Sequence, residues 1–168
     1  MKGANNKKFI PNLSYDCVIF GFNGEKLKIL ILEYHNTGLF ALPGGYIKKE
    51  ESLQEAVNKG VEERTGIKDV FLDQFQTFGK LNRTDPDATR SILQAKNKDL
   101  NEKQWMMERF ITVGHYALIN YENVNPKPDN LSDSIAWYDI KNVPQLMMDH
   151  NEIVDKALEV LRNNISEK

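Results

Sequence analysis

The 168-residue chain has a single cysteine, Cys17, so it can form neither an internal disulfide nor a cysteine cluster for a metal ion. No apolar run is long enough to cross a bilayer, and the longest, LKILILEY, suits a β-strand. The net charge of −2 gives no overall field that would attract nucleic acid or an anionic membrane. The first residues, MKGANNKKF, lack the apolar stretch of a signal peptide. These absences indicate a soluble, cytoplasmic protein without a membrane partner.

Along the chain, apolar runs typical of strands alternate with helical patterns. Two β-rich runs flank the Asn-Gly dipeptide at 23–24, which predicts a hairpin because both positions accept positive φ. Ser52 and Glu55 have the spacing of a capping box, so a helix is predicted from there to Thr65, with Gly66 as its C-cap. Further strands are expected in DVFLDQFQTFG, RFITVGHYALINYE and SIAWYDI, and a second helix in NEIVDKALEVLRNNI. This mixture predicts an α/β sandwich with a mixed sheet.

Residues 80–107 are polar and too long for an ordinary loop of a compact domain. Such a segment is usually functional or contains a helix of its own, and DATRSILQAK is the candidate helix. Trp105 either packs this segment onto the domain or joins a dimer contact. The segment is therefore expected to be an insert in a single domain, 1–168, and to cover or line a pocket.

A glycine-rich segment and the helix after it, PGGYIKKEESLQEAVNKGVEERTGI, resemble the box motif of the Nudix hydrolase family. Gly45 begins the motif, Glu51 follows at the family interval, and Gly66-Ile67 close it. The resemblance implies a Nudix-like α/β/α sandwich with a mixed sheet. For an active member it also implies Mg²⁺-dependent cleavage of a nucleoside diphosphate derivative such as ADP-ribose.

The residues expected to hold the metal depart from the family motif. Lys59 stands for the family arginine, Gly60 for the glutamate after it, and Arg64 for the second of two paired glutamates. A helix turns about 100° per residue, so positions 60, 63 and 64 share one sector, where only Glu63 has a carboxylate. Arg64 places a permanent positive charge where a cation would bind. Glu63 would be the catalytic carboxylate and a weak metal ligand only if the chain were active, with Glu51 as an outer ligand; otherwise no cofactor is expected.

Glycine inside a helix costs about 1 kcal/mol relative to alanine, so Gly60 requires an explanation. Either a ligand or a neighbouring backbone approaches the space that the carboxylate left, or the glycine is drift after catalysis was lost. Arg64 could then pair with Glu63 or bind an anionic ligand.

The chain is also similar to the sensor domains of bacterial Nudix-related transcription regulators, which sense ADP-ribose-like nucleotides or sugars such as arabinose. The similarity lies in DCVIFGF, LPGGYIKKEESLQEA, ERTGIKDVFLDQFQTFG, GHYALIN and DHNEIVDKALEVLRN. Such regulators continue into a DNA-binding winged helix, whereas this sequence ends at Lys168. The sequence is either a fragment or a stand-alone relative, and contact with DNA would require a domain outside it. The resemblance implies a homodimer.

The residues expected to contact a ligand are cationic, aromatic or acidic side chains in and after the box: Tyr46, Lys59, Glu63, Arg64, Arg83 and Arg109. Each arginine taken singly is equally compatible with a surface charge or a loop ion pair. His115 and His150 are interpreted as hydrogen-bonded structural residues, and Phe78 as core.

Three hypotheses remain. The first is a non-catalytic sensor that binds a nucleotide-sugar or a small sugar, the second is a Nudix pyrophosphohydrolase, and the third is an interaction domain that has lost its ligand.

Overall fold

The computed structural model describes residues 7–166. The extreme ends, MKGANN and EK, to which the expectations of a missing signal peptide and a polar tail partly refer, lie outside the described residues. Within residues 7–166, no helix combines the length and the apolarity needed to cross a membrane.

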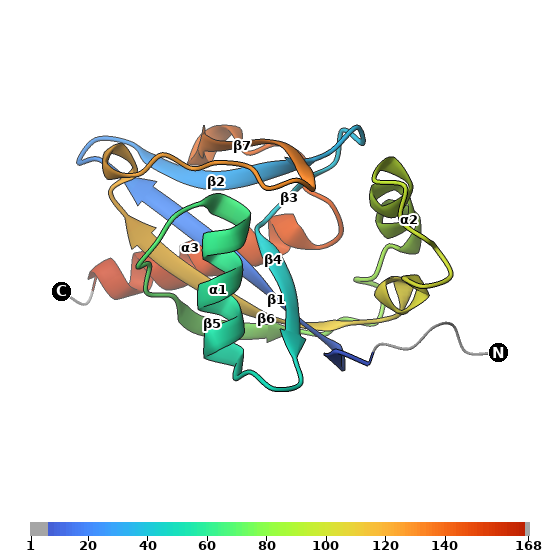
Figure 1. Cartoon of the computed structure of the whole chain (residues 1–168). Helices are drawn as coiled ribbons and strands as arrows, with labels where there is room; N and C mark the ends of the chain where they lie inside the picture. Colours follow the sequence, from blue (N-terminus) through green and yellow to red (C-terminus); the bar gives the residue numbers. More distant parts are fainter. Residues whose placement is uncertain (1–6, 167–168) are drawn as a thin grey trace.

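Seven strands form one mixed sheet whose central strands run parallel to each other (Figure 1). The strands are β1 (Phe9–Phe22), β2 (Leu27–Tyr34), β3 (Phe40–Ala41), β4 (Gly44–Lys48), β5 (Asp73–Phe78), β6 (Ile111–Ile119) and β7 (Ser132–Asp139). The long strand β1 pairs with β6 along one edge, while its other edge pairs first with β4 and then with β2. The predicted strands are all present, and β3 and β4 take up the short extended segment around the paired glycines.

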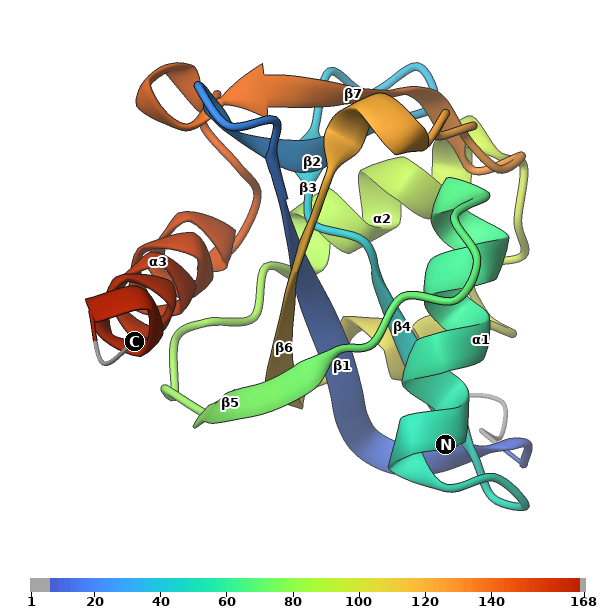
Figure 2. The same ribbon diagram turned by 90° about the vertical axis from the view of Figure 1, so that its left-hand side faces the viewer.

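Two helices cover opposite faces of this sheet, and a third lies apart from them. The α-helices are α1 (Leu53–Thr65), α2 (Pro86–Ala95) and α3 (His150–Ser166). Figures 1 and 2 show α1 on one face and α3 on the other, with α2 beside the sheet. The predicted α/β/α sandwich is confirmed, and so is the helix within the insert 80–107.

Side-chain alternation along β1 divides the core into two layers. Tyr15, Cys17 and Ile19 pack under α1, whereas Val18 and Phe20 pack under α3. Because both faces are covered, the central strand is a nearly continuous apolar run. Cys17 is completely buried and belongs to the core, together with Val154 and Leu161. Phe78 is also buried in the core, as predicted.

The loop between β1 and β2 differs from the tight two-residue turn that the Asn-Gly dipeptide suggests. The last pair of the hairpin is Phe22 with Leu27, so four residues connect the strands. Only Gly24 has positive φ, at 98°, because the Asn23 side chain caps the loop instead. Its Oδ1 accepts hydrogen bonds from the backbone N–H groups of Glu25 and Lys26, at 3.0 and 2.9 Å.

Helix α1 begins and ends as its local sequence predicts. The Ser52 hydroxyl accepts from the backbone N–H of Glu55, and the Glu55 side chain accepts from the Ser52 N–H. Gly66 ends the helix with a left-handed φ of 73°, which an L side chain adopts only at a cost. These caps fix the position of the box helix against β4.

We predict that Ser52→Ala lowers the free energy of unfolding by about 1 kcal/mol, because it removes the acceptor that caps the first turn of α1. Chemical denaturation with circular dichroism measures the change. Ser91→Ala is the matched control, since the Ser91 hydroxyl bonds only to the Asp87 carbonyl within exposed α2. An equal loss in both variants would contradict a specific capping role for Ser52.

Candidate functional site

A cavity of about 490 Å³ opens between the glycine-rich loop, the start of β1 and the insert. Its volume is in the range of about 300–1,000 Å³ that is typical of small-molecule sites. The residues that line it come from seven parts of the chain: Ser14, Tyr15, Asp16, Tyr34, Leu42, Gly44, Gly45, Tyr46, Arg64, Arg83, Thr84, Thr89, Ile92, Leu93, Lys96, Lys98, Lys103, Met106, Glu108, Phe110, Asn130, Leu131, Met147, Met148 and His150.

The insert forms one wall of this cavity through α2 and the segment after it. Buried Trp105 holds this wall in place by packing its ring against Phe9, Tyr46 and Phe110, at centroid distances of 5.4, 4.9 and 6.2 Å. Of the two alternatives for Trp105, the structure therefore shows packing of the insert onto the domain. The expectation that the insert lines a pocket is confirmed.

Gly60 is required because the side chain of Tyr15 fills the space beside it. A Cβ added at Gly60 would overlap the Tyr15 hydroxyl and lie 2.8 Å from Cζ. A Cβ at Gly45, which pairs with Tyr15 across β1 and β4, would lie 2.6 Å from the same hydroxyl. From the sequence, a ligand or a neighbouring backbone was expected beside Gly60. The group that approaches it is instead the side chain of a tyrosine.

The hydroxyl of Tyr15 does not replace the missing carboxylate chemically. Burial raises its pKa well above the ordinary value, Cys17, Glu51 and Glu63 act in the same direction, and Arg64 opposes them. The phenol is therefore neutral at physiological pH, whereas metal binding by a tyrosine requires the phenolate. Tyr15 is not among the residues expected from the sequence. The alternation of β1 could have placed it under α1, but its approach to Gly60 depends on the packing of the helix.

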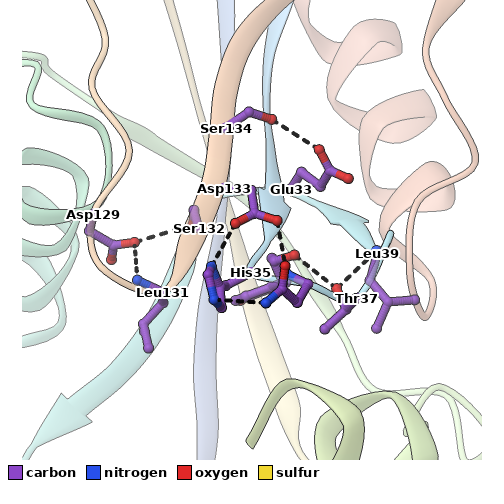
Figure 3. A network of polar contacts seen from close by, with 11 residues as sticks. Glu33, His35, Thr37, Leu39, Asp129, Leu131, Ser132, Asp133 and Ser134 are labelled. Atoms are coloured by element: carbon purple, nitrogen blue, oxygen red, sulfur yellow. Dashed lines mark hydrogen bonds and ion pairs between the residues drawn. The ribbon is translucent and has the colours of Figure 1, made fainter. Parts of the chain in front are cut away.

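Arg64 extends into the cavity and is held from behind by Asp129. Its Nε lies 3.0 Å from Asp129 Oδ2, and the other carboxylate oxygen accepts from Leu131 N–H and the Ser132 hydroxyl (Figure 3). The guanidinium carbon lies 5.4 Å from the centre of the Tyr34 ring. The pair that was considered from the sequence, Arg64 with Glu63, is replaced by Arg64 with Asp129.

Two nitrogens of Arg64, Nε and Nη2, are buried without a hydrogen-bond partner among residues 7–166. The Nε–H is close to Asp129 but is not directed at its oxygen. A buried donor without an acceptor is costly, by about 1–3 kcal/mol. Because the side chain lines the cavity, an anionic or polar ligand atom there would complete its hydrogen bonds.

The residues present do not fit a family-type magnesium site. In residues 7–166 no group of three or more His, Cys, Asp or Glu side chains is arranged to hold a metal ion. Glu63 is exposed and does not line the cavity, and Glu51 accepts a hydrogen bond from the backbone N–H of Lys48 at 2.8 Å. A hard divalent cation needs several oxygen ligands, but Gly60 and Arg64 supply none.

The structure brings some of the predicted ligand residues together and separates others. Tyr46, Arg64 and Arg83 line the same cavity. Lys59 lies in a second hollow beside α1, together with Glu51. Arg109 is exposed and donates to the carbonyl of Gly79 at 2.8 Å.

Arg83 is a buried structural cation rather than a surface charge. It donates to both carboxylate oxygens of Asp149, at 2.9 and 3.1 Å, and to the Phe110 carbonyl at 3.0 Å. Asp16 and His150, which the sequence did not single out as ligand residues, lie beside it at the floor of the cavity. The sequence holds no local signal for this cluster, since its members come from β1, the insert and the start of α3.

Positive charge dominates the lining of the cavity. Five cationic side chains line it, and the carboxylates of Asp16 and Glu108 are the acidic ones: the cations are Arg64, Arg83, Lys96, Lys98 and Lys103. The three lysines belong to the insert and the arginines to α1 and the base of the insert. This distribution favours an anionic ligand that contacts both the box helix and the insert.

We predict that Gly60→Ala lowers the free energy of unfolding by roughly 1–3 kcal/mol, because the new methyl group overlaps Tyr15. Alanine at an ordinary helical site would instead stabilise the protein by about 1 kcal/mol. The control Lys59→Ala, at an exposed neighbour, is expected to change stability by less than about 0.5 kcal/mol.

A double-mutant cycle isolates the contact between the two residues. Tyr15→Phe removes the overlapping hydroxyl and is expected to recover part of the loss in Gly60→Ala. Additive effects of the two substitutions, measured by denaturation, would show that the tyrosine is not the reason for the glycine.

Three proteins show what the chain is similar to. Over 160 residues it is 24% identical to the ADPR responsive transcriptional repressor NtrR of Acinetobacter baylyi, which covers 91% of this chain and 55% of the repressor. The chain thus spans about half the length of this relative. It is also 22% identical to the ADP-ribose pyrophosphatase of Methanocaldococcus jannaschii, over 92% of this chain and 79% of that enzyme.

Among solved structures, the fold is similar to the NUDIX domain of Shewanella oneidensis NrtR complexed with ADP ribose. The TM-score is 0.68 at 24% identity, covering 90% of this chain and 89% of that domain. A structure of NrtR from the same organism complexed with a 27mer DNA matches with a TM-score of 0.60, over 89% of this chain and 61% of that one. At this identity the structural similarity establishes the fold.

The NUDIX domain family matches residues 11–158. The match begins within β1 and extends into α3, so it includes all of the sheet except the first residues of β1, together with the box helix and every segment that lines the cavity. The chain therefore belongs to the NUDIX family.

Proposed function

We propose that this domain binds an ADP-ribose-like nucleotide in the 490 Å³ cavity without hydrolysing it, and that it is the sensing part of a transcription regulator. One observation carries the proposal: at two positions where the family motif would have metal-binding carboxylates, Tyr15 packs against Gly60 and Arg64 presents a guanidinium. A neutral phenol and a permanent cation cannot replace two carboxylates as ligands of a divalent ion.

The arginine at position 64, where the family motif has a glutamate, also creates an anion site. Two buried nitrogens of Arg64 lack a well-directed hydrogen bond among residues 7–166, and the side chain lines the same cavity as the lysines of the insert. A diphosphate would accept hydrogen bonds from the guanidinium and be attracted by the lysines, with no metal ion as a bridge. This favours a nucleotide over a neutral sugar such as arabinose, which offers no negative charge to the three lysines of the insert.

The relatives support a ligand of this class. One is described as an ADPR responsive repressor, and the NUDIX domain of another was crystallised with ADP ribose. Any contact with DNA belongs to the proposal as well, and would use a domain outside residues 1–168. The homodimer implied by the resemblance stays a prediction, which light scattering would test.

A second candidate is an ADP-ribose pyrophosphatase. It is favoured by the similarity to the archaeal enzyme over most of both chains. Glu51 and Glu63 are two carboxylates that remain in the box, and both raise the pKa of Tyr15 electrostatically. Whether an altered metal site forms there is decided by an assay of AMP release.

We predict that ADP-ribose binds with the same dissociation constant, within about twofold, in excess Mg²⁺ and in EDTA, because no described residue requires the metal as a bridge to phosphate. Isothermal titration calorimetry measures the two constants, and chromatography of the same samples measures AMP. Mg²⁺-dependent release of AMP that disappears in Glu63→Gln would overturn the proposal in favour of the pyrophosphatase.

We further predict that Arg64→Gln weakens the binding of ADP-ribose by roughly tenfold or more, the value of a lost hydrogen bond to a charged group. Arg109→Gln is the matched control: it removes the same charge outside the cavity and is expected to leave the dissociation constant unchanged. Thermal unfolding of each variant without ligand separates loss of binding from loss of fold. If both substitutions weakened the binding of ADP-ribose equally, the diphosphate of the ligand would be bound away from Arg64.

A further inference from the structure

The floor of the cavity contains a hydrogen-bond donor and an acceptor that face each other without bonding. His150 Nε2 and Asp16 Oδ1 are 3.5 Å apart, whereas an N–H···O hydrogen bond is about 2.9–3.0 Å long. Both residues line the cavity, and only 6% and 7% of their surfaces are exposed. They are outside the glycine-rich box and take no part in the anion site at Arg64.

The tautomer of His150 follows from its second nitrogen. Nδ1 lies 3.1 Å from the backbone nitrogen of Leu42 and accepts its hydrogen, so it carries no proton of its own. In the neutral ring the proton is then on Nε2, the nitrogen that faces Asp16. His150 therefore offers a donor to the cavity floor.

Asp16 offers the complementary acceptor on one oxygen only. Its Oδ2 accepts a hydrogen bond from the Thr112 hydroxyl at 2.7 Å and lies 3.8 Å from Arg83 Nη2. Its Oδ1 is left for another donor. A Cβ at Gly44, the residue paired with Asp16 across β1 and β4, would lie 2.5 Å from this oxygen, so the glycine keeps it uncovered.

A hydroxyl group is the partner that satisfies both atoms. It can donate its hydrogen to Asp16 Oδ1 and accept the hydrogen of His150 Nε2 at the same time. A phosphate oxygen suits this place poorly, because it would face the carboxylate of Asp16 while Arg83 is already neutralised by Asp149. A third polar atom nearby, Thr84 Oγ1, is buried without a hydrogen-bond partner among residues 7–166 and also lines the cavity.

We propose that Asp16 and His150 form a sugar-binding subsite that takes a hydroxyl of the terminal ribose of the nucleotide. The inference rests on the proposed function, since it assumes that the anionic part of the same ligand is held by Arg64 and the lysines of the insert. The cavity thus has two parts. Cations at the box helix and the insert bind phosphate, and the donor–acceptor pair at the floor forms hydrogen bonds with the sugar.

The backbone and an ion pair hold this pair of side chains in place. Arg83 bonds both oxygens of Asp149, which directly precedes His150 at the start of α3. Met148 has a φ of 52°, which is unfavourable for a side chain of its size and fixes the turn into the helix. The subsite is formed before any ligand arrives, which lowers the entropic cost of binding.

The test compares ADP-ribose with ADP, which lacks the terminal ribose, on the unmodified chain and on two variants of His150. His150→Asn keeps an acceptor near Nδ1 for Leu42 and removes the Nε2 donor; His150→Gln restores a donor near Nε2. We expect Asn to weaken ADP-ribose binding by about tenfold and ADP binding by less than about twofold, and Gln to recover most of the loss.

The outcomes separate this inference from the proposed function. Failure of the unmodified chain to bind ADP-ribose would overturn both. Binding that His150→Asn weakens equally for ADP-ribose and ADP, or does not weaken at all, would overturn only the sugar subsite.

A ligand-side measurement covers the case in which the His150 variants do not fold, which thermal unfolding reveals. Analogues of ADP-ribose that lack the 1″-, the 2″- or the 3″-hydroxyl of the terminal ribose are titrated into the unmodified chain. We expect at least one of them to bind about tenfold more weakly than ADP-ribose, and equal affinities of all four ligands would overturn the subsite.

Discussion

The fit of the Tyr15 side chain between two glycines is the constraint on which the site depends. Tyr15 lies on the central strand β1, Gly45 on β4 and Gly60 on the box helix α1, so one side chain joins the three elements that form the box. Any side chain at either glycine would collide with it. The space beside both glycines is therefore protein interior, and the neighbouring Arg64 lines the cavity.

Arg64 changes how a phosphate group can be held. A metal ion neutralises a diphosphate and polarises it for attack, and it must be bound before the ligand is cleaved. A guanidinium supplies charge and directed donors at all times, but it does not generate a nucleophile. Asp129 holds Arg64 near the cavity without using its N–H groups fully, because its own carboxylate is also bonded to the loop at Leu131 and Ser132. Under the proposed function, Arg64 therefore serves binding rather than turnover.

The parts of the fold that the sequence predicts are those set by near neighbours. The capping box of Ser52 and Glu55 and the glycine C-cap act within a few residues, so α1 was predicted correctly. The reason for Gly60 was not, because Tyr15 is distant in sequence and approaches only when β1 packs under the helix. Arg83 was recognised as a candidate, but its burial depends on Asp149, which another element contributes. Side chains that are far apart in the sequence and meet only in the folded chain leave no periodic pattern in the sequence.

The same buried ion pair decides which part of the cavity is rigid. Arg83 belongs to the insert, and Asp149 directly precedes α3, so their two hydrogen bonds tie one wall of the cavity to the helix that covers the sheet. Removing one partner of a buried pair typically costs about 3–5 kcal/mol, so this wall cannot move away from α3 without a large penalty. The lysines lie further along the insert and are exposed or half-buried. Adjustment to the anionic part of a ligand is therefore expected at the rim, while the floor with Asp16 and His150 keeps a fixed geometry.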